Sequence, residues 1–219
     1  MSEQQHIAAI ILAAGRSSRM RDGQQKLLLP LGDRPVITHV LQNTLASQAQ
    51  PILVVLGHQQ QQLREQLAPY LTQPRISLLT NAEYSQGMST SLRTGIEALL
   101  SMHRTTSIAG AMILLGDQPL MTSVIIDMLI ATKHTTAARI VAPLYHGKRG
   151  NPVIFDTSLF PELLEITGDE GGRRIIERHK TEIATCPLPD AQAQYDVDTW
   201  DAYQHVVELW QKNHTEEAH

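Results

Sequence analysis

The sequence predicts an α/β protein with a Rossmann-like open sheet, mostly parallel, and helices on both faces. Three observations support this fold class. Hydrophobic residues make up 42% of the 219 residues and aromatic residues only 4%, so aliphatic side chains must build the core, as they do in buried parallel sheets. Apolar runs without alternation indicate strands covered on both faces, and segments with helical spacing separate them. Strands and helices therefore alternate, as an open α/β sheet requires.

The first half of the chain predicts two β-α-β units. Residues 7–13 form an apolar run that Gly15 closes, and we expect them to be the central strand. The polar stretch 16–25 that follows is too long for a simple turn, which makes it a candidate functional loop. The other expected elements of this half are a helix from Pro35, a strand at 52–56, a helix at about 59–67 and a strand at 76–79.

The second half begins in the same way and then breaks the alternation. A helix after Gly87, a buried strand at 111–115 and a helix at about 123–133 continue the pattern. Two strands then follow each other, at 140–143 and 151–155, with only a polar segment between them. We therefore expect an antiparallel or inserted element here that shapes the pocket of a second substrate. The last expected elements are a strand near 183–186 and a helix whose apolar face carries Trp200, Tyr203, Val207 and Trp210.

Length, charge and cysteine content limit the possible classes of protein. The length suits one domain, which we expect at residues 1–212, followed by a polar, disordered tail at 213–219. The net charge of -4, without a basic stripe, argues against a nucleic-acid partner. The single cysteine, Cys186, cannot form an internal disulfide, which fits a reducing compartment. The N-terminal apolar run is too short for export or for spanning a bilayer, so we expect a cytoplasmic protein with no membrane partner.

A candidate triphosphate site follows the first strand. Small residues at the strand end allow close approach of a ligand to the backbone, and three cations after it could neutralise a triphosphate: Arg16, Arg19 and Lys26. The segment is not a Walker loop, because Leu27 follows Lys26 where a serine or threonine would hold the metal. The absence of a G-x-G-x-x-G pattern argues against a dinucleotide-binding dehydrogenase. The alternative interpretation is a basic, solvated loop.

Two carboxylates are candidate metal ligands. Asp117 stands just past the strand at 111–115, where ligands meet the carboxyl ends of an open sheet, and it suits a hard cation such as Mg²⁺, or Mn²⁺ in its place. A single carboxylate rarely holds magnesium without help, and Asp198 is the expected second ligand, with Asp196 as the alternative. Asp196 and Asp198 could instead only cap the last helix.

Two further segments are candidate substrate contacts. Gly87, Met88 and Ser91 lie where a helix is expected to begin, so backbone amides and hydroxyls there could contact a base or a ribose. Simple capping of that helix by Ser89 is the alternative. Polar and basic side chains of the second half could bind an anionic acceptor: His146, Lys148, Arg149, Asn151, Arg173 and Arg174.

Ordered sequence blocks cover nearly the whole chain: LAAGRSSRM with KLLLPL, QGMSTSLRTG, LLGDQPL, GNPVIF, GDEGGRR and YDVDT. Together they resemble the MobA-like nucleotidyltransferases and, within that family, the molybdenum cofactor cytidylyltransferases. One departure is the stretch 21–25, which is slightly longer than the usual Met-Gly before the lysine. The resemblance implies an enzyme that transfers CMP from CTP to the terminal phosphate of a molybdopterin-type cofactor and releases pyrophosphate.

The resemblance also implies roles for individual residues. Catalysis would depend on Lys26, Arg19, Asp117 and Asp198, with Mg²⁺ on the two carboxylates. The nucleotide would lie against Ala13, Ala14, Gly15, Arg16, Arg19, Lys26, Gly87, Met88, Ser91 and Asp117, and the acceptor against Asn151, Arg173 and Arg174. A molybdenum hydroxylase or its chaperone would be a transient partner. The alternatives are a guanylyltransferase, a sugar-phosphate nucleotidyltransferase, and a non-catalytic carrier of the cofactor.

Overall fold

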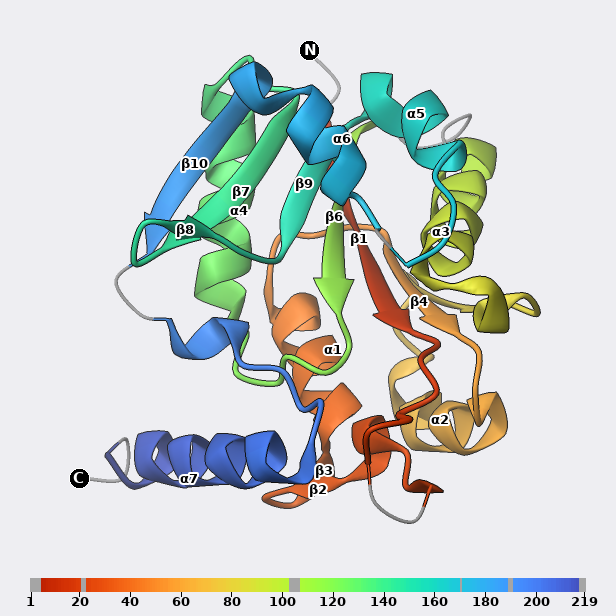
Figure 1. Ribbon diagram of the computed structural model, residues 1–219, viewed down its shortest axis with the longest axis vertical. Helices are drawn as coiled ribbons and strands as arrows, with labels where there is room; N and C mark the ends of the chain where they lie inside the picture. Colours follow the sequence, from red (N-terminus) through yellow and green to blue (C-terminus); the bar gives the residue numbers. More distant parts are fainter. Residues whose placement is uncertain (1–4, 21–22, 103–106, 170, 189–190, 217–219) are drawn as a thin grey trace.

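One sheet forms the centre of the molecule in the computed structural model, which describes residues 5–20, 23–102, 107–169, 171–188 and 191–216. Its strand order is β10-β7-β9-β6-β1-β4-β5, and β8 pairs with β7 (Figure 1). These strands are β1 (His6–Ala13), β4 (Ile52–Leu56), β5 (Ile76–Thr80), β6 (Ile108–Leu115), β7 (Ile140–Tyr145), β8 (Lys148–Arg149), β9 (Val153–Asp156) and β10 (Ile183–Leu188). A separate hairpin consists of β2 (Pro30–Leu31) and β3 (Arg34–Pro35).

The helices lie on both sides of this sheet (Figure 1). They are α1 (Val36–Ala46), α2 (Gln60–Leu67), α3 (Met88–Met102), α4 (Ser123–Thr135), α5 (Phe160–Leu164), α6 (Arg173–Arg178) and α7 (Trp200–Glu216). Within the ranges described above, none of them combines the length and the apolar character needed to cross a membrane.

The topology places a ligand site beside the central strand. β1 pairs in parallel with β4 on one side and with β6 on the other. The chain adds β4 and β5 on the first side and then returns to β6 on the second, so the winding direction reverses between β1 and β6. Open α/β sheets bind their ligands at the carboxyl ends of the strands at such a reversal. The loops after β1 and β6 are therefore the expected place for the site.

The second half of the sheet contains the expected antiparallel element. β9 lies between β6 and β7 and is antiparallel to both, whereas β7 and β10 are parallel. The predicted fold class, a mostly parallel open sheet with helices on both faces and an antiparallel element in the second half, is confirmed.

Two layers of apolar side chains hold the helices to the sheet. Ile7 and Ile11 of β1 point into a core shared with α1, α2 and α4. Ala8 and Ile10 point into a second core shared with α3, α5 and α6. This burial on both faces explains why the first strand shows no alternation of apolar and polar residues.

The C-terminal helix α7 packs against the β2–β3 hairpin. Gly32, in the hairpin turn, has a φ of +64°, and a Cβ there would lie 2.3 Å from the Trp210 ring. The Trp210 ring also meets His39 edge-on, with the ring centroids 5.9 Å apart. The Tyr203 hydroxyl donates a hydrogen bond of 2.5 Å to the carbonyl oxygen of Pro30. The hairpin and α7 are thus joined by close packing and by a direct hydrogen bond.

Residues 213–216 of the expected tail are helical, because α7 continues to Glu216. Asn213 donates a hydrogen bond of 3.1 Å to the side chain of Gln192, and His214 stacks on Trp210 with centroids 4.0 Å apart. These contacts anchor the last turns of a polar segment whose composition alone gives no signal for a helix. Residues 217–219 lie outside the described residues.

Candidate active site

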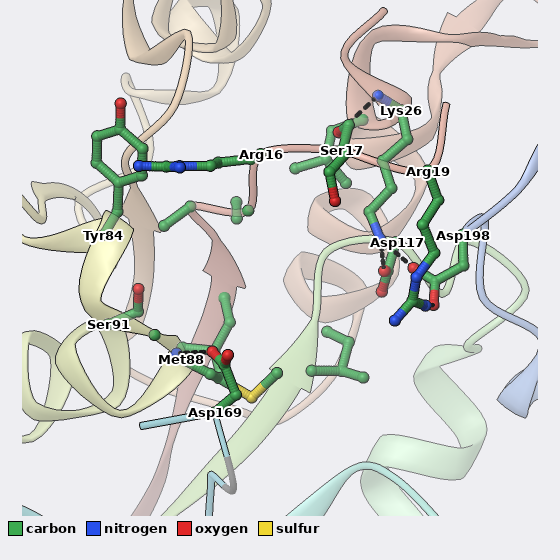
Figure 2. Close-up of a pocket in the computed structure, with 18 of the residues that line it drawn as sticks. Arg16, Ser17, Arg19, Lys26, Tyr84, Met88, Ser91, Asp117, Asp169 and Asp198 are labelled. Carbon is green, nitrogen blue, oxygen red and sulfur yellow. Dashed lines mark hydrogen bonds and ion pairs between the residues drawn. The ribbon is translucent and has the colours of Figure 1, made fainter. Parts of the chain in front are cut away.

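A cavity of about 670 Å³ opens at the carboxyl ends of β1 and β6. The loop after β1, the start of α3, and the segment before α7 surround it, so parts of the chain that are distant in sequence contribute to one site (Figure 2). Its lining includes every residue that the sequence predicts to bind the nucleotide or the metal: Ala13, Ala14, Gly15, Arg16, Arg19, Lys26, Gly87, Met88, Ser91, Asp117 and Asp198.

The loop between β1 and Lys26 is held in shape by the buried amide of Gln25. Its Nε2 donates to the carbonyl oxygens of Gly15 and His58, both at 3.3 Å. Its Oε1 accepts from the Ser17 hydroxyl, and Ser17 Oγ in turn accepts the backbone N–H of Lys26 at 3.1 Å. The sequence alone does not identify Gln25 as a site residue, because a neutral amide beside a lysine gives no signal before its distant partners are known.

Lys26 lies at the centre of a cluster of charges. Its Nζ donates to Asp117 Oδ2 and, at 2.5 Å, to Asp198 Oδ1 (Figure 2). Arg19 Nη1 donates to Asp198 Oδ2 at 2.8 Å. The Lys26 and Asp117 side chains are each only 14% exposed, so water screens this contact poorly. The structure thus brings together the four residues predicted to be catalytic, and Lys26 contacts the carboxylates that were predicted to hold the metal.

The charges of the cluster stabilise one another. Burial alone would lower the pKa of Lys26, but the Asp117 and Asp198 carboxylates outweigh it and raise that pKa. Burial opposes the ionisation of Asp198, yet the hydrogen bond and charge of Lys26, helped by Arg19, hold its pKa below the ordinary value. The Lys26 ammonium and the Asp198 carboxylate are therefore both charged at neutral pH.

Asp196 lines the same cavity in a different electrostatic situation. Burial, followed by the repulsion of Asp117 and Asp198, raises the pKa of Asp196. The next residue, Val197, donates its backbone N–H to the carbonyl oxygen of Asp117 at 2.9 Å. That bond ties the segment before α7 to the end of β6. It explains how Asp198 comes to lie beside Asp117.

The two carboxylates fit a divalent cation that takes its remaining ligands from a substrate. Asp117 Oδ1 is buried and has no hydrogen-bond partner, and a bound cation would satisfy it. The described residues contain no group of three or more histidine, cysteine, aspartate or glutamate side chains arranged to hold a metal. Mg²⁺ is commonly bound by one or two carboxylates together with substrate phosphates, so Asp117 and Asp198 match this mode of binding.

The other wall of the cavity carries an aromatic residue that the sequence analysis missed. Arg16 lies over the Tyr84 ring, with its guanidinium carbon 5.8 Å from the ring centroid (Figure 2). Ser91 Oγ accepts a hydrogen bond of 2.9 Å from the Asn81 side chain. This wall offers a guanidinium group placed over an aromatic ring, and a hydroxyl, to a base or ribose. A tyrosine between two predicted elements gives no sign that an arginine from another loop covers it.

A second cavity, of about 800 Å³, adjoins the first. Asn151 and Arg173 line it, as predicted for the acceptor site, and so do Lys148 and Arg149. Arg174 is not among its lining residues, because neighbouring positions of α6 point about 100° apart and cannot all face one cavity. The apolar part of this second cavity comes from Leu92, Ile113, Val153 and Phe155. The two cavities share Leu12, Met88, Leu115 and Asp169.

Known proteins with similar sequences or structures match this chain over nearly its whole length. PucB of Bacillus subtilis, a purine catabolism protein, is 30% identical over 92% of this chain and 96% of its own length. The molybdenum cofactor cytidylyltransferase of Escherichia coli is 26% identical over 90% of this chain and 93% of its own length. The crystal structure of Rv0371c from Mycobacterium tuberculosis superposes with a TM-score of 0.78 at 28% identity, covering 93% of this chain and 98% of that one.

Other comparisons concern the metal and the family. A structure of Rv0371c in complex with manganese matches with a TM-score of 0.74 at 26% identity, covering 93% of this chain and 99% of that one. The family model of the MobA-like NTP transferase domain matches residues 9–183, which include most of β1, the Lys26 loop and Asp117. On the basis of this match, the fold and the site, the chain belongs to the MobA-like NTP transferase family.

Proposed function

We propose that this protein transfers CMP from CTP to the terminal phosphate of a molybdopterin-type cofactor and releases pyrophosphate. The observation that carries the proposal is the pair of adjoining cavities, one with the Lys26, Asp117 and Asp198 cluster and the other with an apolar lining and basic residues. The first suits a triphosphate with a metal, and the second suits a flat, anionic acceptor. The 26% identity to a molybdenum cofactor cytidylyltransferase supports this choice of substrates.

The charges of the cluster indicate what the nucleotide must bring with it. Lys26 and Arg19 already face Asp117 and Asp198, so these side chains balance one another. A triphosphate adds several negative charges, which Arg16 alone cannot neutralise. Asp117 and Asp198 would hold Mg²⁺, or Mn²⁺ in its place, and the bound cation would supply charge neutralisation at the reacting phosphates. Lys26 and Arg19 would then donate hydrogen bonds to the phosphate oxygens.

The proposed reaction is an in-line displacement at the α-phosphorus of CTP. A bond forms between that phosphorus and an oxygen of the acceptor's phosphate, and the bond to the β-phosphate oxygen breaks. No general base is needed, because a phosphate monoester is already largely ionised at neutral pH. Catalysis would come from holding the two phosphates in line and from stabilising charge, which are the roles that Lys26, Arg19 and Arg16 can perform.

The test measures pyrophosphate release from each of the four nucleoside triphosphates with molybdopterin, with a sugar phosphate and without an acceptor, followed by mass analysis of the product. The binding of molybdopterin is measured separately. We expect release with CTP only when molybdopterin is present, and a product that carries CMP. A product that carries mainly GMP would contradict the use of CTP and indicate GTP as the substrate. Release with sugar phosphates but not with molybdopterin would change the acceptor. Tight binding of molybdopterin without any pyrophosphate release would indicate a carrier that serves a molybdenum hydroxylase.

A further inference from the structure

The first turn of α3 is capped by a loop that belongs to the second cavity. The N–H of Met88 donates to Asp169 Oδ1 at 3.0 Å (Figure 2). The N–H of Ser89 donates to the carbonyl oxygen of Gly168 at 3.0 Å. The amides at a helix start have no partner inside the helix, and a carboxylate there also interacts favourably with the helix dipole. The residue before α3 is Gly87, which has no side chain that could cap the helix itself.

The contact between the two segments is close. Gly87 has a φ of +114°, and a Cβ there would lie 2.7 Å from the carbonyl carbon and oxygen of Gly168 and 2.9 Å from Asp169 Oδ1. On the other side, a Cβ at Gly171 would lie 3.1 Å from Met88 Sδ. The start of α3 and the loop around Asp169 therefore fit together without space for a further side chain.

These two segments face different substrates in the proposed function. Gly87, Met88 and Ser91 line the nucleotide cavity, whereas the loop continues into Arg173 of the acceptor cavity. Asp169 lines both. Because the loop accepts the Met88 and Ser89 amides, these two donors are already in use, and the base must be selected by the shape and the remaining groups of this wall.

We propose that Asp169 is a positioning residue that sets the nucleotide preference of the enzyme by fixing the first turn of α3 from the acceptor side. The inference rests on the proposed function in one respect, which is that residues 87–91 contact the base of the nucleotide. It does not require CTP to be the preferred nucleotide, and it does not require the acceptor to be molybdopterin.

The experiment measures the dissociation constants of all four nucleoside triphosphates with Mg²⁺ for the full-length chain and three variants. Asp169→Ala removes the oxygen that accepts the hydrogen bond from the Met88 N–H, whereas Asp169→Asn keeps one side-chain oxygen that can accept it. Glu97→Ala is the matched control, because Glu97 is an exposed carboxylate on the same helix, α3.

The measured quantity is the ratio of the dissociation constants of the second-best and the preferred nucleotide. We expect Asp169→Ala to reduce this ratio by on the order of tenfold, the size expected for one charge-assisted hydrogen bond. Asp169→Asn should restore most of the ratio, and Glu97→Ala should leave it unchanged.

The outcomes separate this inference from the proposed function. A ratio for Asp169→Ala within twofold of the wild type would overturn the inference, as would a wild type without preference among the four nucleotides. A wild type that prefers GTP, and loses that preference in Asp169→Ala, would support the inference and reject the proposed use of CTP. Gly87→Ala gives an independent check, because its side chain would push the same two segments apart, and it should also reduce the ratio. Thermal unfolding of each variant verifies that the fold is retained.

Discussion

Lys26 is the residue on which the electrostatics of the cavity depend, because the carboxylates of Asp117 and Asp198 both accept hydrogen bonds from its ammonium group. In this state Lys26 neutralises the two carboxylate groups that would hold a divalent cation. In the proposed function, the lysine and the cation would therefore compete for the carboxylates until phosphate oxygens give the lysine other acceptors.

Replacing Lys26 should accordingly have opposite effects on two ligands. Lys26→Ala should weaken CTP binding by roughly tenfold to a hundredfold, because a charge-assisted contact to phosphate contributes about 1.5–3 kcal/mol. The same variant should bind Mn²⁺ more tightly than the wild type in the absence of nucleotide, because the carboxylates lose their resident cation. Equilibrium titrations with each ligand measure both effects, and Lys212→Ala on the exposed side of α7 is the control. Unchanged affinity for both ligands would mean that the Lys26 loop is only a solvated connection.

At the scale of residues, the charged groups of the site could be predicted from the sequence, but their hydrogen bonds to distant backbone groups could not. Arg16, Lys26 and Asp117 were identifiable because charged groups follow buried strands at the end of the sheet where ligands bind. Gln25 and Asp169 were not, because each acts through a backbone group that is distant in sequence. Only the fold shows which amides and carbonyls need such partners.

At the scale of elements, β9 is held to the neighbouring helix by an ion pair. Lys133 Nζ of α4 donates to Asp156 Oδ2 at 2.7 Å and to the carbonyl oxygen of Ala138 at 3.0 Å. Asp156 also accepts the N–H of Ser158 at 2.9 Å. Burial opposes the ionisation of Asp156, but these bonds outweigh it and keep its pKa below the ordinary value. The end of the antiparallel strand is thereby fixed against α4.

Asp156→Asn should lower the free energy of unfolding by about 1–3 kcal/mol at pH 7, because it removes the charge from two hydrogen bonds and leaves the largely buried Lys133 without its counter-ion. A carboxylate whose pKa is lower in the folded state stabilises the protein above its unfolded pKa of about 3.9 and loses that contribution as the pH falls through the folded value. The difference between wild type and variant should therefore shrink below about pH 4. Urea unfolding at several pH values measures it, and a difference that grows on acidification would contradict this account.

The elements themselves were predictable to differing degrees. Long apolar runs predicted β1, β4 and β6 well, because burial on both faces leaves a clear pattern. α5 and α6 were missed, because five or six residues are too few to establish a helical period. The break in alternation indicated an antiparallel element, but its insertion between β6 and β7 depends on pairing between distant strands, which local pattern does not encode.

At the scale of the whole molecule, nucleotide binding should stabilise the fold, because the first cavity joins the loops after β1 and β6 to the segment before α7. A ligand at a hundred times its dissociation constant contributes about 2.7 kcal/mol, which for a domain of this size raises Tm by roughly 5–11 °C. We expect this shift with CTP and Mg²⁺ together. Thermal unfolding measures it, and Asp117→Asn, which weakens the metal site without removing a packing group, should give a much smaller shift. An equal shift in the variant would argue against Asp117 as a metal ligand.

The packing of α7 on the hairpin has a mechanical consequence for the site. Lys26 lies shortly before the hairpin and Asp198 shortly before α7, and the contact of Gly32 with Trp210 fastens these two elements together. Asp117, in contrast, is attached to the central sheet through β6. The packed hairpin and α7 therefore support Lys26 and Asp198 from one side, and the hydrogen bond from Val197 to the carbonyl oxygen of Asp117 joins Asp198 to the end of β6 from the other. We therefore expect a substitution at Trp210 to change the spacing of these charges, and with it the rate of the proposed reaction, without altering any group that lines either cavity.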